Sequence, residues 1–146
     1  MTLVDTTVWI DLFRNADTPQ VRELERLIHS NEDVCICGVI LTEVLQGIRD
    51  DKDYARTLAS FDAFVLLPMS PLTFLKAAEL YRTLRSHGLT IRNSVDCMIA
   101  AVAIEHDVPL LHNDRDYEAI ASLGTLRVVG TGKPTKPLKA RQPRRQ

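Results

Sequence analysis

The segment Leu3-Val4-Asp5-Thr6-Thr7-Val8-Trp9-Ile10 decides the fold of this chain. It opens with a short apolar run, continues with an acid, and then carries apolar residues at helical spacing. We therefore expect a strand that ends at Val4 and a helix that runs through Phe13, with Thr6 or Thr7 as the helix cap.

The same order of strand and then helix is repeated along the rest of the chain. Further strands are expected at 34–37, 64–67, 110–111 and 126–129, and further helices at 19–28, 39–48, 51–61, 71–87, 95–106 and 114–123. The strands are continuous apolar runs, which is typical of a parallel sheet buried under helices on both faces. The sequence therefore predicts an α/β fold with right-handed crossovers.

Capping residues mark where several of these helices begin. Thr18-Pro19 and Ser70-Pro71 each combine a capping hydroxyl with a proline at the first helical position. For three other helices the expected caps are Asp51 or Asp53, then Ser94, and finally Asn113 or Asp114.

Length and composition indicate one ordinary globular domain. The chain has 146 residues, of which 45% are hydrophobic and 25% charged, and a chain of this length can bury a core without disulfides. No apolar run approaches the roughly 20 residues of a membrane span, and no secretory signal is evident, so we expect a cytoplasmic protein. The three cysteines, an odd number without zinc-ligand spacing, are expected to be buried and reduced.

Charge is distributed unevenly along the chain. Residues 1–129 hold all 19 acids and 12 of the 18 basic residues, a net charge of −7, whereas residues 130–146 hold six basic residues and no acid. We interpret 1–129 as the folded domain and 130–146 as a disordered basic tail. The tail is either a solvated end that aids solubility or an arm that contacts nucleic-acid phosphates.

Five acids occupy positions where surface exposure is hard to explain. Asp5 and Asp114 follow the first and fourth expected strands, which are plausibly adjacent, and Asp116 lies two residues further on. Glu43 and Asp96 lie in apolar helical stretches. Ligands of such a sheet bind at the carboxyl ends of its strands, so all five side chains can converge there. Each acid taken alone has a simpler interpretation, as a helix cap or a half-exposed helix residue.

Clustered carboxylates repel one another unless a cation lies between them, and oxygen ligands favour a hard divalent ion such as Mg²⁺ or Mn²⁺. Such an ion lowers the pKa of bound water, and the resulting hydroxide can attack a phosphodiester. Polar and basic neighbours can then support the carboxylates or bind a phosphate: Thr6, Thr7, Ser94, Asn113, Arg92 and Arg115. His112 is interpreted as structural or supporting.

These residues resemble a known family, the PIN-domain ribonucleases, and in particular VapC-type toxins of bacterial toxin–antitoxin pairs. The resemblance extends from Met1 to about Val129 and is carried by the opening segment, Thr42-Glu43-Val44-Leu45-Gln46-Gly47, Ser94-Val95-Asp96-Cys97-Met98-Ile99-Ala100-Ala101 and Leu111-His112-Asn113-Asp114-Arg115-Asp116-Tyr117.

The resemblance implies a three-layer α/β/α fold and Mg²⁺- or Mn²⁺-dependent cleavage of RNA. Asp5, Glu43, Asp96 and Asp114 match the acidic quartet of the family, and Asp116 matches an acid present in many members. Thr6 matches a polar position near the metal less closely. The resemblance also implies a homodimer and a VapB-type antitoxin that covers the cleft and itself binds DNA, so that DNA is a partner only indirectly. The basic extension after Val129 is longer than such toxins commonly carry.

The sequence is also compared with the requirements of a phosphatase, a receiver domain and a binding module. A phosphatase of the haloacid dehalogenase type needs an acid two residues after Asp5, where this chain has Thr7. A receiver domain needs an acidic pair before its first helix, which is not evident. The non-enzymatic alternative is a PIN-like binding module that has lost catalysis and acts in a protein or nucleic-acid complex.

Overall fold

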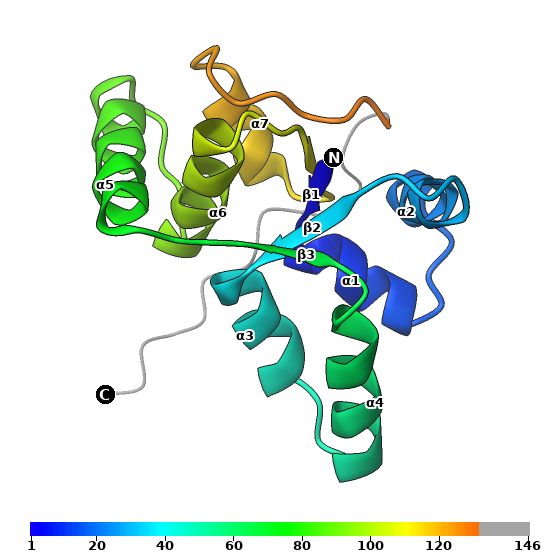
Figure 1. Cartoon of the computed structure of the whole chain (residues 1–146). Helices are drawn as coiled ribbons and strands as arrows, with labels where there is room; N and C mark the ends of the chain where they lie inside the picture. The colour runs from blue at the N-terminus through cyan, green and yellow to red at the C-terminus, as the bar shows by residue number, and fades with distance from the viewer. Residues whose placement is uncertain (132–146) are drawn as a thin grey trace.

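The computed structural model describes residues 1–131, which form four strands and seven helices around a central sheet (Figure 1). The strands are β1 (Thr2–Val4), β2 (Val34–Cys37), β3 (Val65–Leu67) and β4 (Leu110–Leu111). Their order in the sheet is β3-β2-β1-β4, and every pair is parallel. The predicted parallel sheet, with the first and fourth strands adjacent, is confirmed.

The helices are α1 (Thr6–Phe13), α2 (Pro19–His29), α3 (Gly38–Gln46), α4 (Asp51–Phe61), α5 (Pro71–Ser86), α6 (Ser94–Glu105) and α7 (Arg115–Ala121). The chain crosses the sheet in one direction from β1 to β3 and then returns past β1 to β4. Since crossovers are right-handed, the two directions place their helices on opposite faces. In Figure 1, α5, α6 and α7 lie above the sheet and α1, α3 and α4 lie below it, which confirms the three-layer α/β/α architecture.

The return of the chain past β1 positions the site. Strand β1 pairs with β2 on one side and with β4 on the other. The amide of Asp5 donates a 2.9 Å hydrogen bond to the carbonyl of Leu111, so the segments that follow β1 and β4 leave the sheet side by side. Ligand sites of open α/β sheets form at such a reversal of strand order.

Two predicted helix starts are confirmed. The hydroxyl of Thr18 accepts a 3.1 Å hydrogen bond from the amide of Val21. Ser70 and Thr73 form a reciprocal capping box at the start of α5. In both helices proline occupies the first turn, where its missing N–H costs nothing.

Three other caps lie one residue before the expected position, at Asp5, Asp50 and Asn93. They replace the expected Thr6 or Thr7, Asp51 or Asp53, and Ser94, although Asp5 taken alone was also interpreted as a helix cap. At each of these helix starts, several residues able to cap lie next to or near one another in the sequence. Which of them is the cap depends on where the backbone of the folded chain turns into the helix. Of the two residues proposed for α7, Asp114 is the cap.

Two expectations about strands were wrong. Strand β3 is not buried, because it lies at the edge of the sheet and leaves Val65 38% and Leu66 57% exposed. The expected strand at 126–129 is reduced to an isolated bridge between Val128 and Leu110.

The core contains the expected apolar residues of β1, β2 and β4 and most of those of α6. Trp9 packs against Phe61 and Phe64 with ring centroids 5.0 Å apart in both pairs, and its indole N–H donates to the carbonyl of Val4. The three cysteines are buried and free, as expected. No helix of residues 1–131 is long and apolar enough to cross a membrane. Of the expected basic tail, residues 132–146 lie outside the described part of the chain.

Candidate metal centre

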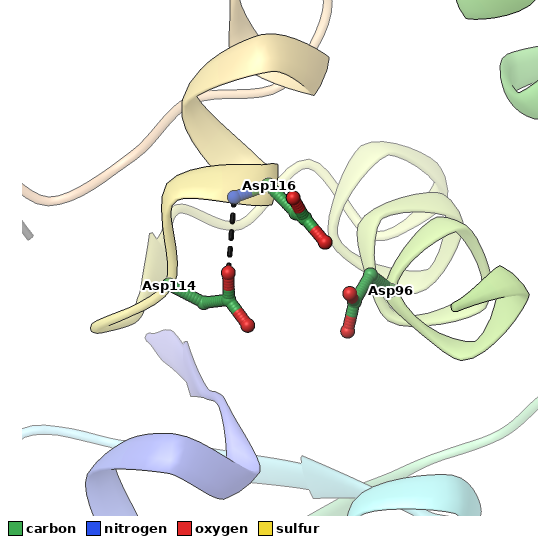
Figure 2. A group of neighbouring side chains, drawn as sticks. All are labelled: Asp96, Asp114 and Asp116. Carbon is green, nitrogen blue, oxygen red and sulfur yellow. Dashed lines mark hydrogen bonds between the residues drawn. The ribbon is translucent and has the colours of Figure 1, made fainter. Parts of the chain in front are cut away.

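Three aspartates converge at the carboxyl edge of the sheet. Asp96, Asp114 and Asp116 each offer a carboxylate oxygen, and these oxygens lie within 4.8 Å of one another. All three residues are buried. Figure 2 shows Asp96 pointing from α6 toward the two aspartates at the start of α7. The structure thus joins one residue of α6 to two residues that follow β4.

Local structure explains why these side chains point inward. Asp114 caps α7, and its Oδ1 accepts a 3.0 Å hydrogen bond from the amide of Asp116 (Figure 2). Asp96 lies in the first turn of α6, whose cap is Asn93. The partial positive charge at two helix N-termini offsets some of the repulsion among the carboxylates.

Asp5 lies outside this group of three and is connected to it by a tyrosine. Its Oδ2 accepts hydrogen bonds from the amide and the hydroxyl of Thr7, at 3.0 and 2.6 Å. Its Oδ1 accepts a 2.6 Å hydrogen bond from the hydroxyl of Tyr117, which also donates to Oδ1 of Asp96 at 3.4 Å. Both carboxylate oxygens of Asp5 therefore accept hydrogen bonds, and the Tyr117 hydroxyl contacts both Asp5 and Asp96.

Glu43 lies at the margin of the site and is not part of the group of three. It is half-buried on α3, and its Oε1 accepts a 2.9 Å hydrogen bond from the hydroxyl of Thr6. Burial raises the pKa of the Cys37 thiol, and the negative charges of Asp5 and Glu43 raise it further. The charges of Asp5 and Glu43 therefore both raise the pKa of the Cys37 thiol, which lies at the end of β2.

Asn113 contacts Thr7 and Asp11, and its predicted role as a supporting residue stays a prediction. Its amide N–H donates to the hydroxyl of Thr7 at 3.1 Å, and its side chain donates to Asp11 at 3.1 Å. Asn113 thus supports Asp5 through Thr7. It also links the segment after β4 to α1.

The two arginines proposed for phosphate binding are exposed. Arg115 is the first residue of α7, and Arg92 lies in the loop before α6. Ser94, the first residue of α6, is exposed as well. Each lies within four residues of Asp96 or Asp114 in the sequence. The role of the two arginines toward a phosphate stays a prediction.

Sequence reasoning missed the role of Tyr117. An apolar aromatic position in a helix predicts core packing, and the ring is indeed fully buried, but its hydroxyl contacts two acids. Burial raises the pKa of Tyr117 well above its usual value, and the charges of Asp5 and Asp96 add to the shift, so the hydroxyl keeps its proton. The signal in the sequence was its position directly after Asp116.

His112 supports the site without facing the cluster as a ligand. Its Nδ1 accepts a 3.2 Å hydrogen bond from the amide of Asp114, which leaves the ring proton on Nε2, 3.4 Å from Glu118. Burial lowers the pKa of His112 more than the nearby acids raise it, so the ring is neutral at pH 7. This agrees with its interpretation as a supporting residue.

The donor set of the site fits a hard divalent cation. Mg²⁺ bonds to oxygen at about 2.1 Å in an octahedron, so its opposite ligands lie about 4.2 Å apart. The carboxylate oxygens of the three aspartates lie within 4.8 Å of one another, a separation of the same scale. Burial, together with the charges of Asp96 and Asp116, raises the pKa of the Cys97 thiol to about 11.

The sequence of this chain is similar to those of known proteins. A family model described as PIN domain matches residues 2–123. Ribonuclease VapC11 of Mycobacterium tuberculosis is 32% identical over 131 residues, which cover 88% of this chain and 98% of that protein. The chain therefore belongs to the PIN-domain family and, by its similarity to VapC11 over nearly the whole of both chains, to the VapC ribonucleases within it.

Solved structures show the same fold. The structure of VapBC2 from Rickettsia felis bound to a DNA fragment from its promoter matches with a TM-score of 0.71 at 20% identity and covers 88% of this chain and 96% of that chain. VapBC-1 from nontypeable Haemophilus influenzae matches with a TM-score of 0.69 at 20% identity and covers 92% and 98%.

Proposed function

We propose that this protein is a metal-dependent endoribonuclease that acts as the toxin of a toxin–antitoxin pair. The observation that carries the proposal is the convergence of Asp96, Asp114 and Asp116 at the carboxyl edge of the sheet. Two like charges about 4 Å apart repel by about 4 kcal/mol in a medium of effective dielectric about 20. A buried group of three needs a cation for all of its members to ionise, and Mg²⁺ or Mn²⁺ suits its oxygens.

Each acid has its own role in this proposal. Asp96, Asp114 and Asp116 would hold the cation, and Asp5, oriented by hydrogen bonds on both of its oxygens, would complete the ligand set. When bound, the cation supplies a water of lowered pKa and neutralises charge on the phosphate. Glu43, which is half-buried, can receive a proton at the solvent side of the site.

The RNA is held by basic side chains outside the carboxylates. Arg92 and Arg115 are exposed at the starts of α6 and α7, where a guanidinium can donate two hydrogen bonds to one phosphate group. Support for RNA as the substrate comes from the relatives named VapC ribonucleases. A phosphodiester bound by the arginines would lie beside the cation site.

The protein is proposed to act together with a cognate VapB-type antitoxin. Support comes from the structural neighbours, which are VapBC complexes, one of them bound to promoter DNA. In this proposal the antitoxin covers the carboxylates and contacts the DNA, so that this chain meets DNA only indirectly.

A homodimer is proposed as the assembled form. Two leucines in the first turns of α5, Leu72 and Leu75, are 68% and 62% exposed, and Leu66 of the neighbouring edge strand β3 is 57% exposed. Exposed apolar side chains and an exposed strand edge are typical of an interface. A second copy of this chain is the occupant proposed for it.

The test of the enzymatic proposal is cleavage of pooled RNA by purified wild-type protein in EDTA, Mg²⁺ and Mn²⁺, with Asp96→Asn, Asp114→Asn and Asp62→Asn compared in parallel. Asp62 is an exposed aspartate at the end of α4 and serves as the matched control. We expect cleavage only with metal, a loss of about a hundredfold or more in the two site variants, and wild-type rates in the control. Equal cleavage in EDTA or in Asp96→Asn would contradict the proposal.

Binding without cleavage is the distinct outcome expected of a catalytically silent PIN-like module. Such a protein would bind the metal or RNA and leave the RNA intact under every condition. Three buried acids at one point favour the enzyme, because a pure binding role gains nothing from their mutual repulsion.

A further inference from the structure

The hydroxyl of Tyr117 is the structural link between Asp5 and the group of three aspartates. It lies 2.6 Å from Oδ1 of Asp5 and 3.4 Å from Oδ1 of Asp96. These acids come from different elements, since Asp5 follows β1 and Asp96 lies on α6, while Tyr117 itself belongs to α7. One phenol therefore joins three separate parts of the chain at the site.

The shorter of the two contacts has the character of a strong hydrogen bond. An O–H donor to a carboxylate at 2.5–2.7 Å is a charge-assisted bond, roughly twice as strong as one between neutral groups. The contact with Asp96 is longer and therefore weaker. The phenol thus holds Asp5 firmly and contacts Asp96 more weakly.

The ring of Tyr117 is itself fixed, so the hydroxyl has little freedom to move. The residue is fully buried, and its ring packs against His112 with a centroid distance of 5.0 Å. His112 in turn accepts the amide of Asp114. A phenylalanine would fill the same space, so packing alone does not require the oxygen.

We propose that Tyr117 is a positioning residue for the metal centre, whose hydroxyl holds Asp5 beside Asp96 so that the ligand set is already arranged before the cation binds. This inference rests on the proposed function of the site. Tyr117 acts through Asp5, because Asp5 receives the shorter bond and is the acid that lies outside the group of three. Partners of this kind orient the ligands of metal sites, and their loss typically weakens binding by 10–100-fold.

The test replaces Tyr117 by phenylalanine, which removes only the oxygen. Tyr54→Phe makes the same chemical change on α4, at a side chain that is 41% exposed, and is the matched control. Mn²⁺ affinity is measured by electron paramagnetic resonance on metal-free protein, without RNA, so that the readout is independent of activity. We expect the dissociation constant for Mn²⁺ to rise about tenfold in Tyr117→Phe and to stay unchanged in Tyr54→Phe.

Kinetics separate positioning from simple structural damage. In Tyr117→Phe the Mn²⁺ concentration for half-maximal cleavage should rise by the same factor as the dissociation constant, while the rate at saturating Mn²⁺ returns to within about threefold of wild type. A loss of rate that added metal does not restore would contradict a positioning role. Circular dichroism of the metal-free proteins checks that each variant is as fully folded as wild type.

A double-variant cycle tests whether the phenol acts through Asp5. Asp5→Asn removes the charge that receives the hydrogen bond, so adding Tyr117→Phe to it should weaken Mn²⁺ binding no further. Additive effects of the two changes would overturn the inference, and so would an unchanged affinity in folded Tyr117→Phe. Failure of wild-type protein to bind Mn²⁺ at all would instead refute the proposed function.

Discussion

The side-chain amide of Asn113 donates a 3.1 Å hydrogen bond to the carboxylate of Asp11, a residue 102 positions earlier in the chain. Both residues are buried. The pair therefore fastens α1 to the segment that follows β4. Asp11 was not among the residues predicted to support the site.

Breaking this pair should cost stability. We expect Asn113→Ala to lower the free energy of unfolding by about 1–3 kcal/mol, because it removes a donor from a buried carboxylate. Asn113→Asp should cost more at pH 7, since it places a second charge against Asp11. The exchange Asp11→Asn with Asn113→Asp should recover part of that loss. Urea unfolding of the four proteins measures the effect, and equal stability of Asn113→Asp and wild type would contradict it.

Removing one acid from the metal centre should stabilise the metal-free protein. In EDTA we expect Asp116→Asn to raise the free energy of unfolding by about 1 kcal/mol, because it relieves repulsion from Asp96 and Asp114. With saturating Mn²⁺ the order should reverse, since the wild type gains more from binding. Thermal unfolding with and without metal checks both halves. A metal-free variant less stable than wild type would show that Asp116 is favourably paired without a cation.

The cysteines should resist modification in the native protein. Burial raises the pKa of Cys35 and Cys37, and it raises that of Cys97 to about 11. The reactive thiolate is therefore scarce at pH 8 and is also shielded. We expect Ellman's reagent to titrate three thiols per chain in denaturant, which is the full number in the sequence, and to react far more slowly without it. A fast native reaction of one thiol would indicate local opening.

The pKa of Cys97 also sets the direction of a pH effect. Its value is raised from 9.0 to about 11, so between these two pH values the unfolded state has lost a proton that the native state retains. The contribution of this thiol to stability is therefore complete below pH 9 and decreases as pH rises toward 11. Cys97→Ala should show a shallower loss of stability across this range than wild type in urea unfolding.

The proposed dimer depends on the exposed leucines of α5. We expect Leu72→Asp with Leu75→Asp to convert the protein to a monomer, because two charges would have to be desolvated in the interface. Leu58→Asp on α4, at a leucine that is 42% exposed, is the control and should leave the assembly unchanged. Light scattering coupled to gel filtration gives the mass of each variant. A wild-type protein that is monomeric at all concentrations would contradict the dimer.

The basic tail should contribute to RNA affinity only through charge. Deleting residues 131–146 removes all six basic residues of the tail. If they contact phosphates of single-stranded RNA, the slope of log K against log salt should fall by up to roughly four, at about 0.7 per contact. Binding of a cleavage-defective Asp96→Asn variant, with and without the tail, measures this. Unchanged affinity at every salt concentration would leave solubility as the role of the tail.

Local signals in the sequence were enough for the layers of the fold and for the edge at which the acids meet. Proline after Thr18 and after Ser70 fixed two helix starts, since its geometry favours the first helical turn. Continuous apolar runs such as 34–37 indicated a parallel sheet. Asp5 and Asp114 were placed at one edge because β1 and β4 both end there.

Features that depend on distant parts of the chain could not be predicted in the same way. The exposure of Leu66 follows from the position of β3 at the edge of the sheet, which its own apolar sequence does not encode. The phenol of Tyr117 reaches Asp5 across 112 positions of sequence. That contact requires α7 to be packed over the end of β1, which only the complete fold determines.

The late position of α7 also has a consequence for synthesis of the protein. A ribosome makes Asp5 early, Asp96 much later, and Asp114, Asp116 and Tyr117 only near the end of the folded region. A polypeptide released before codon 114 therefore contains the first strand and lacks both the fourth strand's acids and the tyrosine that steadies Asp5. If the proposed function holds, translation products that end before residue 114 would be unable to cleave RNA, since they lack Asp114 and Asp116.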